Sequence, residues 1–233
     1  MSAALVLLGY VAFVSLLGYT LSALLLPIFG RAWRFVVAPG IVVHELAHAT
    51  ACVLVGARVR EINFWKVSGG HVIHETPRIH LIGPVLISFA PTILMTIMLV
   101  GLAPLLAPES VSHPWLQTPP SSVLAGSVGY VQALLALIVE LPWLEVWPFF
   151  LVYIMLNVAV TIAPSKPDLF NARWSLVAVL LLLFGVGQLL GLRFSLAYIW
   201  PAMAVSLVYL GIAVIGVTLV WLSLYIVRKT PRR

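Results

Sequence analysis

Charged residues are scarce in this chain, and their scarcity argues against a soluble globular protein. Of the 233 residues, 62% are hydrophobic and only 9% are charged, whereas a typical soluble domain has about 25% charged residues. Such a chain lacks the polar surface that it would need to cover itself in water. We therefore expect one membrane-embedded domain over residues 1–233, too short to carry an added soluble module.

Acidic residues and cysteine are rarer still. The single cysteine, Cys52, excludes a disulfide within the chain, and Asp168 is the only aspartate. The net charge is +6, but the basic residues lie at the ends of apolar runs and crowd the C-terminus, without forming a face or a stripe. This distribution is typical of membrane topology and argues against nucleic-acid binding.

Long apolar runs are what the chain has in abundance, and they predict an all-α polytopic protein with about six transmembrane helices. A helix needs about 20 apolar residues to cross the bilayer. The candidate spans are Ala3–Phe29, Phe35–Gly56, Leu81–Ala107, Val146–Ala163, Leu176–Leu192 and Ala197–Val227. Val123–Val139 is also apolar, but it follows two prolines and contains several polar residues. We interpret it as a re-entrant or interfacial helix, with a true span as the alternative.

The basic residues predict the orientation of these spans. If Val123–Val139 does not span, ten of the 13 basic residues share the side of the two termini. Those ten are Arg58, Arg60, Lys66, Arg78, Lys166, Arg173, Arg228, Lys229, Arg232 and Arg233. If it does span, no orientation keeps both the Arg58–Arg78 cluster and the C-terminal cluster inside. The positive-inside rule thus predicts six crossings with the N- and C-termini both cytoplasmic.

The segment Arg58–His80, between the second and third spans, does not have a helical pattern. Apolar and polar residues roughly alternate over Val59–Val67, and Ser68-Gly69-Gly70 provides a turn before a second extended run. This pattern predicts a short β-hairpin. Because an open sheet edge is not tolerated against lipid, we expect the hairpin in water, against the helices or in a cavity.

The strongest functional signal is the pentapeptide His44-Glu45-Leu46-Ala47-His48, an HEXXH motif inside a predicted span. Two histidines four residues apart share one helix face and can bind one cation. Glu45 is then placed to take a proton from a water activated by zinc. Ionisable residues at membrane depth are functional candidates by default, so the motif predicts a metal site.

A catalytic zinc normally has three protein ligands, and Asp168 is the candidate for the third. It follows Pro164 and Pro167, which break the fourth span and free backbone groups. The alternative is that Asp168 only caps the next helix, expected from Leu176.

Taken together, these features resemble the site-2 protease family of intramembrane zinc metalloproteases. The resemblance rests on the HEXXH motif, the hairpin, a span opening with Gly83-Pro84, and a later stretch from Asn157 to Pro167-Asp168. It implies that His44, His48 and Asp168 bind one zinc ion and that Glu45 is the catalytic acid and base. It also implies a catalytic core over residues 35–171, followed by a helix pair over residues 172–233. The gap from Asn157 to Asp168 is longer than in the family pattern, and Pro-Asp-Leu replaces Leu-Asp-Gly, which indicates a divergent branch.

Other polar residues are candidates for substrate binding. Asn157 is placed to hydrogen-bond a substrate backbone or the fixed water, or to join two helices. His71 and His74 are placed to bind metal, to line a substrate edge, or to be hydrated near the membrane surface. The expected partners are the lipid bilayer and a transmembrane protein substrate, which the hairpin edge at Val59–Val67 would hold as an added strand. The alternatives are a membrane metal transporter or sensor and an inactive pseudoprotease. A transporter is expected to place further ionisable residues on other spans.

Overall fold

The computed structural model describes residues 10–21, 33–66, 69–106, 109, 112–141, 145–189, 197 and 199–229. The described chain is mostly helical with one small antiparallel sheet, as predicted. An N-terminal helix covers Tyr10–Leu21. The labelled elements are α2 (Trp33–Val36), α3 (Ala38–Leu54), β1 (Val59–Lys66), β2 (Gly69–His74), α4 (Gly83–Leu106), α6 (Pro114–Gln117), α7 (Val123–Glu140), α8 (Val146–Thr161), α9 (Lys166–Leu189) and α10 (Trp200–Lys229).

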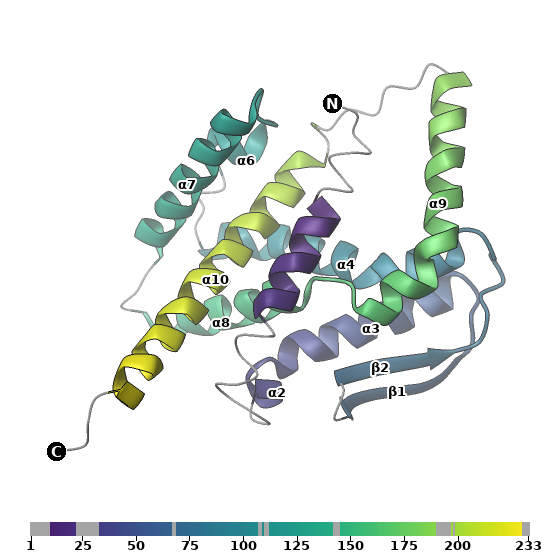
Figure 1. Ribbon diagram of the computed structural model, residues 1–233, viewed down its shortest axis with the longest axis horizontal. Coiled ribbons are helices and arrows are strands. Elements are labelled where there is room, and N and C mark those ends of the chain that lie inside the picture. The colour runs from purple at the N-terminus through teal and green to yellow at the C-terminus, as the bar shows by residue number, and fades with distance from the viewer. Residues whose placement is uncertain are drawn as a thin grey trace.

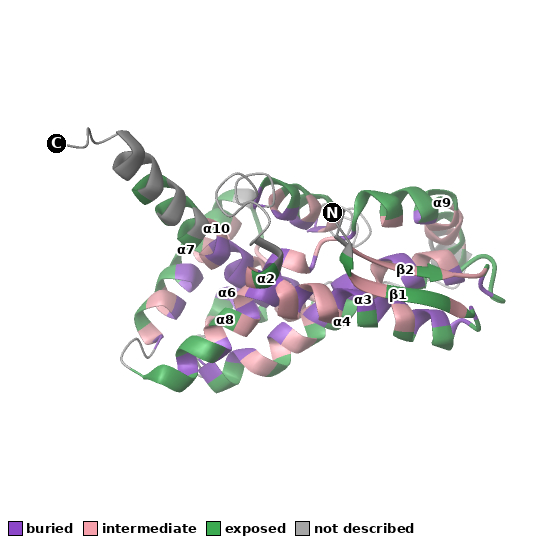
Figure 2. Ribbon diagram, turned by 90° about the horizontal axis from the view of Figure 1, so that it is seen from below, coloured by how far each residue is buried: buried purple, intermediate pink, exposed green. Residues whose placement is uncertain are grey.

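The elements are arranged between two ends of the molecule (Figure 1). Helices α6 and α7 lie at one end and the hairpin and α9 lie at the other, while α10 runs from the middle of the molecule to the lower left, beside α7 and α8. The main hydrophobic core joins the N-terminal helix to α4, α8 and α10, with Met95, Leu99, Met155 and Leu210 fully buried. Buried residues are accordingly concentrated where these helices cross (Figure 2).

The predicted hairpin is present between α3 and α4. Strand β1 pairs with β2 in antiparallel register, with Ile62 opposite Val72 and Asn63 opposite His71. Val59 and Val72 pack on a small second core that includes Cys52, Val55 and Ile87. The hairpin is therefore attached to α3 and α4 through apolar contacts.

The described helices confirm part of the predicted membrane organisation. By length and hydropathy, α4 qualifies as a membrane-spanning helix, and α8 with α9 qualify as one pair bent by 56°. Four further described apolar stretches have only 10–17 residues each: Tyr10–Leu21, Ala38–Leu54, Leu124–Glu140 and Trp200–Gly216. The ends of the predicted span Ala3–Phe29 lie outside the described residues. Val123–Val139 is helical, as α7.

One predicted boundary is wrong. The fifth helix was expected to begin near Leu176, but α9 begins at Lys166, and only four residues separate it from the end of α8. Ser165 supplies the reason, because its hydroxyl accepts a hydrogen bond from the backbone N–H of Asp168, at 3.3 Å. Ser165 is thus the N-cap of α9, and Asp168 lies inside its first turn.

Candidate metal centre

Three side chains from distant parts of the sequence converge at the break between α8 and α9. His44 and His48 come from α3 and Asp168 from the first turn of α9, and their ligand atoms lie within 4.8 Å of one another. The Nε2 atoms of the two histidines are 3.2 Å apart. Asp168 Oδ2 is 3.4 Å from His48 Nε2 and 3.9 Å from His44 Nε2. These side chains form a buried cluster that is within range to bind a metal ion.

The ring of His48 is held by a backbone carbonyl that a proline leaves free. His48 Nδ1 lies 2.7 Å from the carbonyl oxygen of Ile87 in α4. In an α-helix that oxygen would accept a hydrogen bond from residue 91, but Pro91 has no N–H to donate. Pro91 therefore leaves the Ile87 carbonyl available to the histidine.

The ring of His44 is held in the same way by a helix end. His44 Nδ1 lies 2.7 Å from the carbonyl oxygen of Thr161, the last residue of α8. The helical partner of that oxygen would be the N–H of Ser165, which instead donates to Asp168 Oδ2, at 2.7 Å. Gly40 lets α3 approach this end of α8, since a Cβ there would clash with Thr161 and Asn157.

These two contacts assign the protons on the histidine rings. A carbonyl oxygen can only accept, so each Nδ1 carries the proton, and each Nε2 of a neutral ring presents a lone pair. The lone pairs of His44 and His48 then face each other and the Asp168 carboxylate without a hydrogen between them. With both rings neutral, three acceptors lie in contact, and either a bound cation or a proton on one ring would balance them.

The spacing of the three atoms suits a tetrahedral zinc site. Zinc–nitrogen distances of 2.0–2.1 Å place two ligand atoms of a tetrahedron about 3.3 Å apart. Two of the observed separations, 3.2 and 3.4 Å, lie close to this value, and the third, 3.9 Å between His44 and Asp168, is longer. Metal-binding histidines characteristically donate their other ring N–H to a carbonyl or carboxylate, as His44 and His48 do here. The donor set therefore fits zinc.

Asp168 combines the two roles that the sequence left as alternatives. Its Oδ2 faces the histidines and also accepts from the backbone N–H of Ser165, while Ser165 Oγ caps the N–H of Asp168. This reciprocal pair is a capping box, for which Ser-x-x-Asp is the sequence signal. The cap fixes the carboxylate at the position where it faces the metal cluster.

Glu45 lies beside the cluster and is buried, with 5% of its surface exposed. It lines a cavity of about 540 Å³ together with His44, His48 and Asp168. Gly70 in β2 contacts its side chain so closely that a Cβ at position 70 would lie 2.5 Å from Glu45 Oε1. The start of β2 therefore covers the glutamate, and only glycine leaves room for it.

Of the three residues predicted to bind substrate, two lie at the cavity and one does not. His71 and His74 line the 540 Å³ cavity, where His71 Nε2 lies 3.5 Å from Glu61 Oε1 and His74 Nδ1 contacts the Glu75 carbonyl. Asn157 is buried at the α3–α8 contact, away from the lining of this cavity. Its Nδ2 donates to the Tyr153 carbonyl, and its buried Oδ1 has no partner among the described residues. The structure thus brings the two histidines to the site and leaves Asn157 between helices.

The cavity is lined by one strand of the hairpin. Its lining includes residues 70–75, from β2 and the chain that follows it, and none of the residues of β1. The edge at Val59–Val67, which was expected to pair with a substrate, does not contribute to the described lining of this cavity, and its pairing with a substrate stays a prediction. Two residues of α4 complete the wall: Pro84, from the predicted Gly83-Pro84 turn, and Ser88, which the sequence did not indicate.

Comparison with known proteins leaves the site to be interpreted from its own geometry. No family model, no curated protein and no solved structure matches the chain.

Proposed function

We propose that this protein is an intramembrane zinc metalloprotease of the site-2 type, cleaving peptide bonds of transmembrane substrates. The observation that carries the proposal is the convergence of two lone-pair nitrogens and one carboxylate beside a buried glutamate, all on one cavity. Three protein ligands leave a fourth position open, which is typical of a catalytic rather than a structural zinc site.

The residues of the chain have separate roles in this chemistry. Zinc bound by His44, His48 and Asp168 supplies the positive charge that makes a water molecule acidic enough to lose a proton near neutral pH. Glu45 takes that proton as the water oxygen attacks the substrate carbonyl carbon. It then delivers the proton to the leaving nitrogen as the C–N bond breaks.

The same proposal places the chemistry within a bilayer. Large apolar side chains are exposed on several helices, among them Leu54 of α3, Ile97 of α4, Leu181 of α9 and Leu219 of α10. Soluble monomers rarely expose contiguous apolar surface on this scale, whereas lipid covers it without cost. We infer a multi-pass protein with both termini cytoplasmic.

Labelling of single cysteines at Ser2 and Thr230, in a Cys52→Ser background, tests this topology. Labelling of both positions from the cytoplasmic face is the expected result. Labelling from opposite faces would mean that the chain crosses an odd number of times, as it would if α8 and α9 crossed together as one broken span.

The substrate is proposed to bind as an extended strand against β2. In the described sheet, β2 pairs with β1 on one side only, and residues 70–75 face the metal cavity. A transmembrane helix has its peptide bonds hydrogen-bonded internally, so it has to unwind before one of them reaches zinc. A free strand edge supplies replacement hydrogen bonds to the unwound segment.

The test of the function is a cleavage assay with a metal assay in parallel. Detergent-purified full-length protein is incubated with a generic transmembrane peptide, before and after removal of metal by a chelator. We expect cleavage that chelation abolishes and zinc restores. Metal binding with no cleavage of any peptide would contradict the protease and support the metal transporter or sensor.

A further inference from the structure

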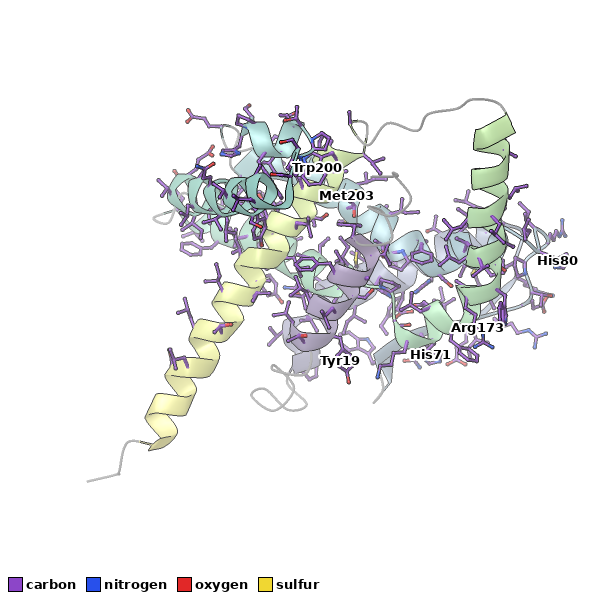
Figure 3. All side chains as sticks on the ribbon, turned by 45° about the horizontal axis from the view of Figure 1, so that its top comes forward. Tyr19, His71, His80, Arg173, Trp200 and Met203 are labelled. Carbon is purple, nitrogen blue, oxygen red and sulfur yellow. The ribbon has the colours of Figure 1, made fainter. Side chains whose placement is uncertain are left out.

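A second cavity meets the first at the metal centre. It measures about 620 Å³ and shares His44, Glu45, Gly70 and Ser165 with the first cavity. It lies between the N-terminal helix, α3, the end of α8 and the first turn of α9. In Figure 3, Tyr19 of this second cavity and His71 of the first lie on either side of the start of α9. Glu45 therefore stands at the junction of two cavities.

The two cavities differ in the chemistry of their walls. The first is lined by His71, His74, Glu75, Ser88 and Asn171 around the metal cluster. The second has an apolar part, formed by Leu16, Ile41, Val160, Ala163, Pro164 and Leu169, beside the polar Ser15, Thr161 and Lys166 and the three polar side chains that it shares with the first. The polar cavity suits water and a peptide backbone, and the apolar part of the second suits a hydrocarbon group.

Close contacts hold the second cavity in shape. Gly18 packs against Ala163, since a Cβ at position 18 would lie 2.9 Å from the Ala163 Cβ. Lys166 Nζ lies 4.6 Å from the centre of the Tyr19 ring, which joins the N-terminal helix to the start of α9. Ser15 Oγ, on the wall, is buried and has no hydrogen-bond partner among the described residues. A buried hydroxyl in this condition is satisfied when a polar group or water enters beside it.

We propose that this second cavity binds the side chain of a substrate residue next to the cleaved bond, and that it selects large aliphatic or aromatic residues there. The inference rests on the proposed function. Successive side chains of an extended peptide point to opposite sides. A peptide paired with β2 in the polar cavity therefore directs alternate side chains across Glu45, towards the second cavity. Its volume lies in the range of small-molecule sites, about 300–1,000 Å³.

The test measures side-chain preference in two independent ways. Transmembrane peptides with Ala, Leu or Phe next to the cleaved bond are compared by kcat/KM. Peptide hydroxamates with methyl, isobutyl or benzyl side chains, which bind zinc directly, are compared by calorimetry on the zinc-loaded full-length protein. Since even one methylene in such a pocket is worth about 10-fold or more, we expect Leu and isobutyl to exceed Ala and methyl by at least about 10-fold.

Two substitutions should move the preference in opposite directions. Leu16→Trp narrows the cavity and should reduce the preference for the larger groups about 10-fold while leaving the Ala peptide within about twofold. Ile41→Ala enlarges it and should shift the preference towards Phe and benzyl. The matched controls are Leu181→Trp, exposed to 67% against 63% for Leu16, and Ile154→Ala, half-buried like Ile41. Both lie outside the two cavities and should change nothing.

The outcomes separate the inference from the function on which it rests. Cleavage of all peptides at one rate, with equal hydroxamate affinities, would overturn the subsite and leave the protease standing. So would a uniform loss for every substrate in Leu16→Trp. Hydroxamates that discriminate by side chain on a protein that cleaves no peptide would uphold the subsite and overturn the protease.

Discussion

Two buried polar clusters of this molecule differ in whether their hydrogen-bond donors and acceptors are matched. In the helical core, Tyr10 Oη lies 2.6 Å from Ser206 Oγ and 3.3 Å from Thr96 Oγ1. Ser206 donates in turn to carbonyls of its own helix, so every hydroxyl has a partner. In the metal centre, the ring N–H groups of His44 and His48 already donate to backbone carbonyls, and three acceptor atoms are left facing one another.

The comparison distinguishes a cluster that supports the fold from one that binds a ligand. Donors and acceptors in the Tyr10 cluster balance without any added group, so it ties the N-terminal helix to α4 and α10 by itself. The histidine cluster has no such balance while both rings are neutral, because buried facing acceptors repel one another, and a bound cation or a proton on one ring would supply it.

The largest effect is expected from replacing Glu45, which lies beside the cluster of His44, His48 and Asp168 without being part of it. Glu45→Gln preserves shape and packing but cannot accept a proton from water, so we expect peptide cleavage to fall by ~10²–10⁴. Zinc content should stay at the wild-type level. An active variant would remove Glu45 from its catalytic role, and a zinc-free one would make it a ligand.

Asp168→Asn tests whether the carboxylate is part of the acceptor cluster or only a helix cap. The amide oxygen of asparagine can still accept the hydrogen bond from the Ser165 N–H, but a neutral amide is a poor ligand for a divalent cation. We expect zinc affinity to fall by more than the 10–100-fold that is typical of groups behind the ligands. Thermal stability of the metal-free protein should not change. Wild-type zinc content with full activity would leave Asp168 with the cap alone.

Pro91→Ala tests whether a free backbone carbonyl supports the ring of His48. Alanine restores an N–H that competes for the Ile87 carbonyl, so the ring of His48 loses part of its support. We expect zinc affinity to fall about 10-fold, with a changed visible spectrum of the cobalt-substituted protein.

Pro104→Ala is the control for this change, because it replaces the other proline that α4 contains beyond its first turn, far from the site along the helix. It should leave both the affinity and the spectrum unchanged. Equal effects of the two substitutions would mean that Pro91 acts only through the shape of the helix.

The smallest effect is expected in the balanced cluster. Tyr10→Phe removes one hydroxyl, and Ser206 keeps its hydrogen bonds to the Ala202 and Met203 carbonyls. The free energy of unfolding should fall by about 0.5–1.5 kcal/mol, measured by denaturant titration in detergent. Zinc affinity should be unaffected. A loss of zinc in this variant would show that the two clusters are coupled and that the distinction between them is wrong.

Local signals in the sequence predicted the parts of the site that depend on spacing. The i, i+4 spacing places His44 and His48 on one face of α3, and the alternation around Ser68-Gly69-Gly70 predicted the hairpin. Asp168 was reached through its neighbouring prolines and the family resemblance. Its convergence with the histidines supports that choice of ligand.

Features that depend on packing between helices could not be predicted from the sequence. The local sequence does not indicate that β2 rather than β1 faces the cavity, because both strands have similar alternating patterns. Contacts of the hairpin with α3 and α4 decide which strand does. The carbonyls of Ile87 and Thr161 carry no side-chain signal. The sequence does contain two signals for these features. Ser165-x-x-Asp168 marks the true start of α9, and Pro91 lies four residues after the carbonyl that it leaves free.

Metal analysis of the purified protein tests the central claim most directly. Wild-type protein is loaded with zinc in detergent, dialysed and measured by mass spectrometry, beside His44→Ala/His48→Ala and, as a control for histidine number, His80→Ala/His113→Ala. These control histidines lie outside the cluster and the metal cavity. We expect about one tightly held zinc ion per chain in the wild type and in the control, and none in the cluster variant. Equal zinc in all three proteins, or none in the wild type, would contradict the assignment of the acceptor cluster as a metal site.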